Sequence, residues 1–334
     1  MSTLLALGLM SAVTAANLKV DTIRLPLAHA AGQHLALHCI APEHATRRSV
    51  LFVHGASFPT MLAAGFEFVP GDSWMAFMAR QGYLACGLDF LGFGDSSRPP
   101  AMRAAAEGGV PVSRAPEAAQ EIAQAVDYLR QQRGITAVHV VAHSWGTIPA
   151  ATFAAAHPAS LASLTLFGPV TPVPGDAGKP DTQARAWWSI TAQQRYRELR
   201  FIDVLPPDLV LLEPAVDRRW AAEFDASAPH AAGDAAGELR IPAGPLADIE
   251  AAQAGDYPYA PGKVTVPVFA VYGDYDTIAT DAETPAFLAR FTASPMKWRL
   301  RIDHGTHVMH LERGRDALYE SVAAFIRATE QLHR

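Results

Sequence analysis

Two segments near the start of the chain alternate apolar and polar side chains. In residues 19–25 and in residues 34–40, apolar side chains recur at every second position. This period of two predicts strands with one buried face, because successive side chains of a strand point to opposite sides of the sheet. Ala30, Ala31 and Gly32 lie between the two segments and suit a tight turn, so the pattern predicts a β-hairpin.

Further along, short apolar runs and stretches with helical spacing follow one another. The strand-like segments are residues 49–53, 83–90, 138–143, 161–167, 266–273 and 297–302. A continuous apolar run is typical of a strand covered on both faces. One helical stretch opens at Pro116, carries Ile122, Val126 and Leu129 on one side, and stops at Gly134. This order predicts the α/β class, with a mostly parallel sheet of about eight strands and helices on both faces.

The alternation breaks between Thr171 and Gly262. Residues 184–200 and 214–224 have helical spacing, no stretch predicts a clear strand, and the remainder is rich in Ala, Gly, Pro and Asp. We therefore predict a core formed by residues 18–170 and 263–334, with residues 171–262 inserted as a mainly helical lid.

Composition and charge narrow the class of partner. The chain has 334 residues, of which 50% are hydrophobic and 18% are charged, so it is long and apolar enough to bury a large core. Its net charge is −6 and its Lys and Arg residues form no cluster. A nucleic-acid partner is disfavoured, since it needs a basic surface to neutralise phosphates. A small neutral or hydrophobic molecule is the expected ligand, and the sequence leaves the oligomeric state open.

The first 17 residues carry no charged side chain. Residues 4–16 resemble the apolar region of a secretory signal, but the basic segment that normally precedes it is missing. We therefore predict a cytoplasmic protein, with a periplasmic or secreted one as the alternative if residues 1–16 act as a signal. No other stretch is apolar over the length of a membrane-spanning helix.

The two cysteines, Cys39 and Cys86, lie in strand-like apolar runs. Two cysteines alone build neither a disulfide framework nor a metal site. Buried free thiols are therefore the expected state.

Ser144 follows an apolar run and has very small residues two positions to either side, Ala142 and Gly146. A serine on a strained strand-to-helix corner needs such neighbours, because the corner brings these positions into close contact. The N–H of Trp145 then lies at a helix N-terminus, where negative charge is stabilised. This arrangement suits an oxyanion.

A serine hydroxyl becomes a good nucleophile when a histidine takes its proton and a carboxylate orients that histidine. In a parallel sheet these groups come from loops at the carboxyl ends of strands. Two late strands end in such residues: Asp274 and Asp276 follow one, and His304 and His307 follow the next.

With these residues in order, the chain resembles the α/β-hydrolase fold superfamily from about residue 18 onwards. The matching motifs are His54-Gly55 after the third strand, the turn at residues 89–96, the corner at Ser144, and Gly273-Asp274-Tyr275-Asp276 followed by residues 307–312. Ala142 is a departure, because the family usually has glycine there.

The resemblance implies a nucleophile Ser144, an orienting carboxylate Asp276 and a general base His307. Asp274 and His304 are the weaker candidates for the last two roles. The resemblance also implies an oxyanion hole formed by the N–H groups of Trp145 and Ala56, with Ser57 as the alternative to Ala56, and it implies no cofactor.

Other polar residues have simpler interpretations. His304, His307 and His310 recur at every third position, but no carboxylate cluster accompanies them, so a metal site is disfavoured. We expect His54 and His143 to be structural and Asp89 and Asp95 to brace their turn. In the lid, four aromatic residues either line a substrate pocket or pack on the core: Trp187, Trp188, Phe201 and Trp220.

The function implied by the resemblance is a serine hydrolase that cleaves a small or medium carboxylic ester through an acyl-enzyme. Serine at the corner argues against the dehalogenase and epoxide hydrolase branches, which resemble this fold but carry aspartate there. A C–C bond hydrolase, a perhydrolase and an aminopeptidase remain alternatives because they share the triad. A ligand-binding protein with little turnover is an alternative from a different class.

Overall fold

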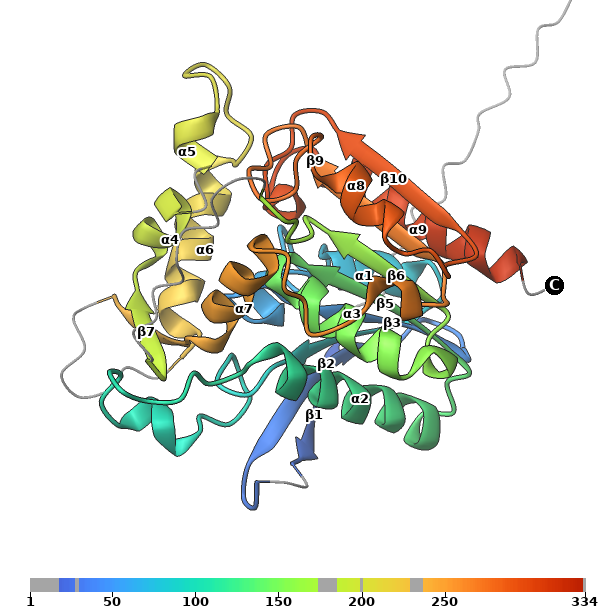
Figure 1. Cartoon of the computed structure of the whole chain (residues 1–334), viewed down its shortest axis with the longest axis horizontal. Coiled ribbons are helices and arrows are strands. Elements are labelled where there is room, and N and C mark those ends of the chain that lie inside the picture. Colours follow the sequence, from blue (N-terminus) through green and yellow to red (C-terminus); the bar gives the residue numbers. More distant parts are fainter. Residues whose placement is uncertain (1–17, 28–29, 174–184, 199–200, 229–236, 333–334) are drawn as a thin grey trace, which may run out of the picture.

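Eight strands form one sheet in the order β1-β2-β4-β3-β5-β6-β9-β10 (Figure 1). The computed structural model describes residues 18–27, 30–173, 185–198, 201–228 and 237–332. The strands are β1 (Val20–Pro26), β2 (His34–Ile40), β3 (Arg48–Val53), β4 (Leu84–Asp89), β5 (Ala137–His143), β6 (Ser163–Phe167), β9 (Val268–Gly273) and β10 (Lys297–Ile302). β2 is antiparallel to both of its neighbours, and the strands from β4 to β10 are parallel. The predicted fold class is confirmed, and the segment before residue 18 lies outside the described residues.

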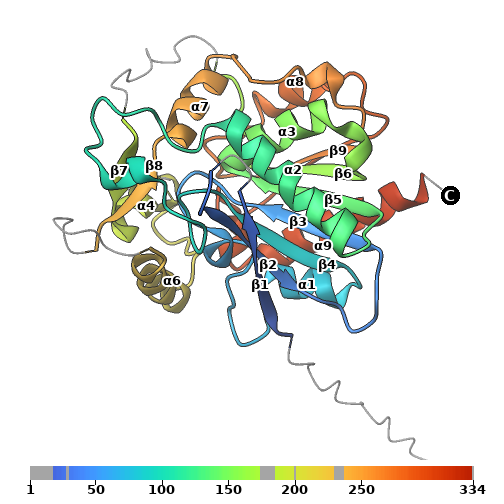
Figure 2. The same cartoon turned by 90° about the horizontal axis from the view of Figure 1, so that it is seen from below.

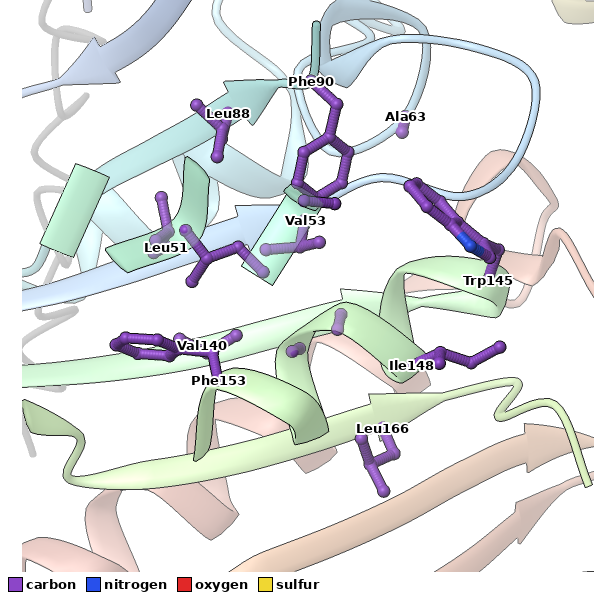
Figure 3. Close-up of a cluster of buried hydrophobic side chains, with 14 of the residues drawn as sticks. Leu51, Val53, Ala63, Leu88, Phe90, Val140, Trp145, Ile148, Phe153 and Leu166 are labelled. Carbon is purple, nitrogen blue, oxygen red and sulfur yellow. The ribbon is translucent and has the colours of Figure 1, made fainter. Parts of the chain in front are cut away.

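Helices cover both faces of this sheet, which is why its central strands are apolar without alternation (Figure 2). The core helices are α1 (Trp74–Arg80), α2 (Ala115–Gln132), α3 (Thr147–Ala156), α8 (Thr284–Ala289) and α9 (Arg315–Gln331). α2, α3 and α8 bury their apolar side chains in one hydrophobic cluster, and α1 and α9 bury theirs in a second. Figure 3 shows part of the first cluster, where Phe153 of α3 lies beside Val140 of β5.

Shorter helical turns join these elements. They are 3₁₀ helices at Thr60–Leu62, Pro100–Arg103, Ser144–Gly146, Pro158–Ser160, Pro261–Lys263 and Met309–Leu311. In the part of the chain that the structure describes, no helix is both long enough and apolar enough to cross a membrane.

The segment between β6 and β9 contains strands as well as helices. Its elements are β7 (Trp187–Ile190), α4 (Ala192–Glu198), α5 (Phe201–Val204), α6 (Pro214–Ala226), β8 (Leu239–Pro242) and α7 (Gly244–Gln253). β7 and β8 form a separate antiparallel pair. The expectation of no strand here was therefore wrong, and so was that of helix over residues 187–190, whereas α4 and α6 lie where helices were predicted, in residues 184–200 and 214–224. Each strand has four residues, and its hydrogen-bonding partner lies about fifty positions away, so local periodicity does not reveal the pair.

Cys39 and Cys86 form a disulfide, so the expectation of buried free thiols was wrong. The antiparallel register of β2 and β4 places the two residues directly opposite each other, with their Cα atoms 4.1 Å apart. Such cross-strand neighbours bring their side chains together on one face of the sheet. The pairing depends on this register, which the cysteine count alone does not determine.

Removing the disulfide should destabilise the protein, because the bond closes a long loop, the two cysteines being 47 positions apart. For the Cys39→Ala/Cys86→Ala variant we expect the free energy of unfolding to fall by about 2–4 kcal/mol. Urea denaturation measures this change. Dithiothreitol should lower the stability of the wild type and leave that of the variant unchanged. Two titratable thiols in denatured, unreduced wild type would contradict the assignment.

Glu121 is a buried carboxyl group in α2 and is only 2% exposed. Its Oε2 accepts a hydrogen bond from the N–H of Leu91 at 3.0 Å. Burial raises the pKa of Glu121 from 4.5 to about 8, and this single hydrogen bond opposes the rise only in part. The folded protein therefore holds a proton that the unfolded chain releases between these two values.

This raised pKa predicts that stability falls as the pH rises from about 5 to about 8, because the folded state must then ionise a buried group. Glutamine keeps an acceptor for Leu91 and never ionises. We compare the free energy of unfolding of Glu121→Gln with that of the wild type at pH 6 and at pH 9. The difference, variant minus wild type, should be more positive at pH 9 by roughly 1–3 kcal/mol. Denaturation at both pH values measures this. Glu320→Gln, at an exposed position of α9, is the control and should have the same effect at both pH values. The prediction would be contradicted if Glu121→Gln also had the same effect at both.

Candidate active site

The loops at the carboxyl ends of β5, β9 and β10 converge on Ser144. β5 ends at His143, and Ser144 has a φ of 56°, which is strained for a residue with a side chain. The chain then turns through the 3₁₀ helix Ser144–Gly146 into α3. A Cβ at Gly146 would lie 2.3 Å from the carbonyl oxygen of His54, so this corner excludes any side chain there. Ala142, where the family usually has glycine, is fully buried and fits the corner.

Ser144, His307 and Asp276 form one chain of hydrogen bonds. The Ser144 hydroxyl lies 2.8 Å from Nε2 of His307. The other ring nitrogen, Nδ1, lies 3.0 Å from each carboxylate oxygen of Asp276. Because a carboxylate only accepts hydrogen bonds, Nδ1 carries the proton, and Nε2 is left to accept from the serine hydroxyl. The imidazole of His307 is thus held in the tautomer that can take a proton from Ser144.

Backbone groups fix the two residues that follow the late strands. Oδ1 of Asp276 also accepts the N–H groups of Ile278 at 2.8 Å and Ala279 at 3.0 Å. Nε2 of His143, which directly precedes the serine, lies 2.8 Å from the carbonyl oxygen of His307 and donates to it. The end of β5 therefore holds the His307 loop by its backbone as well as through the Ser144 side chain.

Gly168, just after β6, closely approaches this hydrogen-bonded chain, and no motif in the sequence points to it. Its φ is 54°, and a Cβ there would lie 2.9 Å from Cε1 and Nδ1 of His307 and 3.1 Å from Oδ2 of Asp276. Any other residue would press on both side chains. A glycine directly after a buried strand was the available signal, but nothing local showed which side chains it would meet.

The weaker candidates for the triad lie outside the hydrogen-bonded chain. Oδ1 of Asp274 accepts the N–H of Gly305 at 3.0 Å, which braces the turn after β10. His304 is exposed and has a φ of 58°. His310 is buried beside His143, their ring centroids 4.8 Å apart. Among the described residues, no group of three or more His, Cys, Asp or Glu side chains is arranged to hold a metal ion.

Two buried histidines next to this hydrogen-bonded chain are neutral. Burial, followed by the neighbouring His310 and His307, moves the pKa of His143 well below its ordinary value. Burial and His307 lower the pKa of His310 to about 3. The His307 ring therefore has no positively charged histidine beside it.

A second buried carboxylate, Asp89, holds the loop after β3. Its Oδ1 accepts the N–H of Thr60 at 2.8 Å, and its Oδ2 accepts from His38 at 2.9 Å and from the N–H of Asp95 at 3.0 Å. Burial alone would raise the pKa of Asp89, but the hydrogen bonds and charges around it, led by those of His38, lower it to about 2. Nδ1 of His54 donates to the carbonyl oxygen of Gly55, so the expected bracing roles of Asp89 and His54 are confirmed.

The residues expected to form the oxyanion hole are both buried. Trp145 follows Ser144 in the chain and is fully buried. Ala56 is 3% exposed. The neighbouring Gly55 lies against the serine, since a Cβ there would be 3.1 Å from Cβ of Ser144. The hydroxyl of Ser57, the alternative residue, is buried with no hydrogen-bond partner in the described part of the chain.

The four aromatic residues singled out in the inserted segment have different surroundings. The indole N–H of Trp220 donates to the carbonyl of Leu62 at 2.9 Å, and its ring meets Phe58 at a centroid distance of 5.3 Å. The indole of Trp187 donates to the carbonyl of Ala104. Trp188 is half-buried on β7, and the side chain of Phe201 lies outside the described part of the structure. Trp220 thus docks the segment on the core near the histidines, through Phe58.

The sequence profile described as the alpha/beta hydrolase fold matches residues 49–314. This chain belongs to the α/β-hydrolase family. The match covers most of the main sheet, the Ser144 corner and the loops that carry Asp276 and His307. No curated protein sequence matches the chain significantly.

Solved structures of other α/β hydrolases share the fold of this hydrolase at low sequence identity. A thioesterase domain from the curacin biosynthetic pathway has a TM-score of 0.60 and 17% identity, over 93% of this chain and 99% of that one. A serine hydrolase from the polyaromatic-hydrocarbon-degrading bacterium Cycloclasticus zankles has a TM-score of 0.59 and 15% identity, over 92% and 98%. A thermophilic esterase from Thermogutta terrifontis has a TM-score of 0.57 and 16% identity, over 92% and 99%.

Gly168→Ala should impair this hydrolase without unfolding it, because the new methyl group would displace His307 and Asp276. We expect hydrolysis of a p-nitrophenyl ester to slow by roughly 10²-fold, the cost of a displacement of about 1 Å in a catalytic geometry. The matched control is Gly134→Ala. Gly134 has a φ of 66°, and a Cβ there would meet nothing within 4 Å, so this variant carries the backbone strain without the steric contact. Equal rates for the two variants would contradict the role of Gly168.

Proposed function

We propose that this α/β hydrolase is a serine hydrolase that cleaves a small or medium carboxylic ester through an acyl-enzyme. The observation that carries the proposal is the hydrogen-bonded chain from the Ser144 hydroxyl through His307 to Asp276. A free hydroxyl is a weak nucleophile, and a histidine base within about 3 Å of it is the usual means of activation.

In the proposed reaction Ser144 Oγ attacks the ester carbonyl carbon while its proton passes to Nε2 of His307. The imidazolium that forms is stabilised by Asp276, whose carboxylate accepts a hydrogen bond from Nδ1–H and stays unprotonated. When the tetrahedral intermediate collapses, the C–O bond of the ester breaks and His307 returns the proton to the leaving alcohol. A water molecule then attacks the acyl-enzyme and loses a proton to His307. The bond between the acyl carbon and Ser144 Oγ breaks, His307 returns the proton to Oγ, and the carboxylic acid is released.

The negative oxygen of the intermediate would be held by the backbone N–H groups of Trp145 and Ala56. The position of Trp145 at the start of the turn into α3 and the contact of Gly55 with Ser144 support this assignment. Backbone donors at a helix N-terminus are already oriented before charge develops, so no reorganisation is needed in the transition state.

We also propose that the segment between β6 and β9, with residues 171–262 as its bounds, is a lid that contributes to substrate selection. A cleft of about 600 Å³ runs between α4, α6 and the loop of residues 205–212 and has mostly apolar walls that include Tyr196, Leu211 and Leu212. It also reaches Glu312, whose carboxylate accepts the N–H and the hydroxyl of Thr306 beside His307. An apolar cleft of this size suits the acyl or alcohol part of an uncharged ester.

The disulfide bears on the compartment in which this function would operate. Disulfides persist in oxidising environments and are rare where thiols are kept reduced. The Cys39–Cys86 bond therefore favours the periplasmic or secreted alternative over the cytoplasmic prediction.

Labelling with a fluorophosphonate tests the proposed nucleophile. The wild type should gain one adduct, located on Ser144 by peptide mass spectrometry, and Ser144→Ala should gain none and lose ester hydrolysis by at least roughly 10⁴-fold. Ser189→Ala, which removes an exposed serine of β7, is the matched control and should label normally. A folded wild type that takes up no label would refute the serine-hydrolase proposal and favour a ligand-binding protein.

A panel of p-nitrophenyl esters of increasing acyl length tests the substrate class. We expect the highest kcat/KM with short and medium acyl chains, since the lid contacts of Trp220 and α7 hold the segment close to the core. Labelling of Ser144 without hydrolysis of any ester would reject the ester assignment and favour the C–C hydrolase, perhydrolase or aminopeptidase reactions of the same triad.

A further inference from the structure

One carboxylate of the inserted segment, that of Asp248, contacts the residue next to the proposed nucleophile. Asp248 lies in α7 and is only 4% exposed. Its Oδ2 accepts the indole N–H of Trp145 at 3.1 Å and the backbone N–H of Ala115 at 2.6 Å. Its Oδ1 accepts Nε of Arg114 at 2.6 Å. The carboxylate therefore joins α7, the first turn of α2 and the corner after β5.

The Trp145 side chain has little freedom to choose another partner. It is fully buried and meets Phe90 edge to face, with the ring centroids 5.2 Å apart, as Figure 3 shows from the side of α3. Without Asp248, the indole N–H would lose its acceptor in a place that water does not reach, which strongly disfavours this orientation of the ring. The hydrogen bond thus selects one position of the indole.

The position of the indole matters because the same residue supplies the proposed oxyanion donor. Its backbone N–H follows directly after Ser144, whose φ of 56° is strained, so this peptide relaxes readily if it is not held. An indole that is fixed at its outer end by Asp248 and packed against Phe90 restrains the Cα of Trp145. The direction of the N–H follows from that restraint.

We propose that Asp248 is a positioning residue that holds the Trp145 N–H in the oxyanion-binding orientation and thereby couples docking of the lid to catalysis. α7 belongs to the inserted segment, and through Asp248 it contacts both the start of α2 and the Ser144–Gly146 turn. The inference rests on the proposed function. Burial raises the pKa of Asp248, and the hydrogen bonds from Arg114 and Trp145 oppose the rise, so the donors compensate a charge that the site otherwise disfavours.

Four variants separate positioning from folding. Asp248→Ala removes the acceptor, and Trp145→Phe removes the indole N–H while keeping a buried ring and the backbone N–H. Asp248→Asn keeps an oxygen for Trp145, while the half-exposed Arg114 turns towards solvent. Arg114→Gln removes only the bond from the Arg114 side chain to Asp248, leaves the bonds from Trp145 and Ala115 in place, and serves as the matched control. Each is measured for kcat and KM on one p-nitrophenyl ester and for Tm.

We expect Asp248→Ala and Trp145→Phe each to lower kcat roughly tenfold and to change KM by less than about twofold. This loss is smaller than the factor of about 10²–10³ in rate that is lost when an oxyanion donor is removed, because the N–H is misdirected but still present. The double variant should be no slower than Asp248→Ala alone, because both changes break the same bond. Asp248→Asn should retain most of kcat. Arg114→Gln should lower Tm and leave kcat unchanged.

Wild-type kcat in Trp145→Phe would overturn the proposal, and so would a double variant in which the two losses multiply. If Asp248→Ala does not fold, Trp145→Phe and Asp248→Asn test the proposal. Trp145→Phe must then lose kcat without a change in KM, and Asp248→Asn, which keeps the acceptor, must retain kcat. A loss of kcat in Asp248→Asn equal to that in Trp145→Phe would count against it. Failure of the proposed function is recognised separately, because the wild type would then neither label at Ser144 nor hydrolyse the ester.

Discussion

The strained backbone at Ser144 is the constraint on which the site depends. A strand that is covered on both faces ends at His143, and the chain has to reverse into α3 within three residues. The reversal places Ser144 at a positive φ, which lifts its hydroxyl towards the loops after β9 and β10. Such strain persists only where the surroundings hold it. Here the surroundings are the contact of Gly146 with the His54 carbonyl and the bond from His143 to the His307 carbonyl.

The parallel sheet explains why three distant loops meet at this corner. β5, β6 and β9 are neighbours and run in the same direction, as β10 does beside β9, so their carboxyl ends lie along one edge. Ser144, Gly168, Asp276 and His307 each follow one of these strands. Burial then sets the charges, since His143 and His310 stay neutral and Asp276 is hydrogen-bonded to the ring of His307. The ring of His307 is thus oriented by a carboxylate, and the buried histidines near it carry no charge.

The inserted segment is joined to the core through hydrogen bonds as well as apolar contacts. Trp220 of α6 donates to Leu62, and Asp248 of α7 accepts from Trp145. The second of these bonds ends on the residue that directly follows Ser144. The segment is therefore bonded to the core at a position next to Ser144.

Periodicity and short motifs in the sequence determined the fold class, the eight strands of the main sheet and the residues that meet at its edge, because these follow from side-chain spacing and from the order of motifs along the chain. The tertiary structure alone decided the pairings of segments far apart: the Cys39–Cys86 disulfide, the β7–β8 pair, the approach of Gly168 to His307, and the bond between Trp145 and Asp248 across 103 positions. Each of these depends on strand register or on the packing of one loop against another. Such geometry arises only when the whole chain has folded, and no local pattern encodes it.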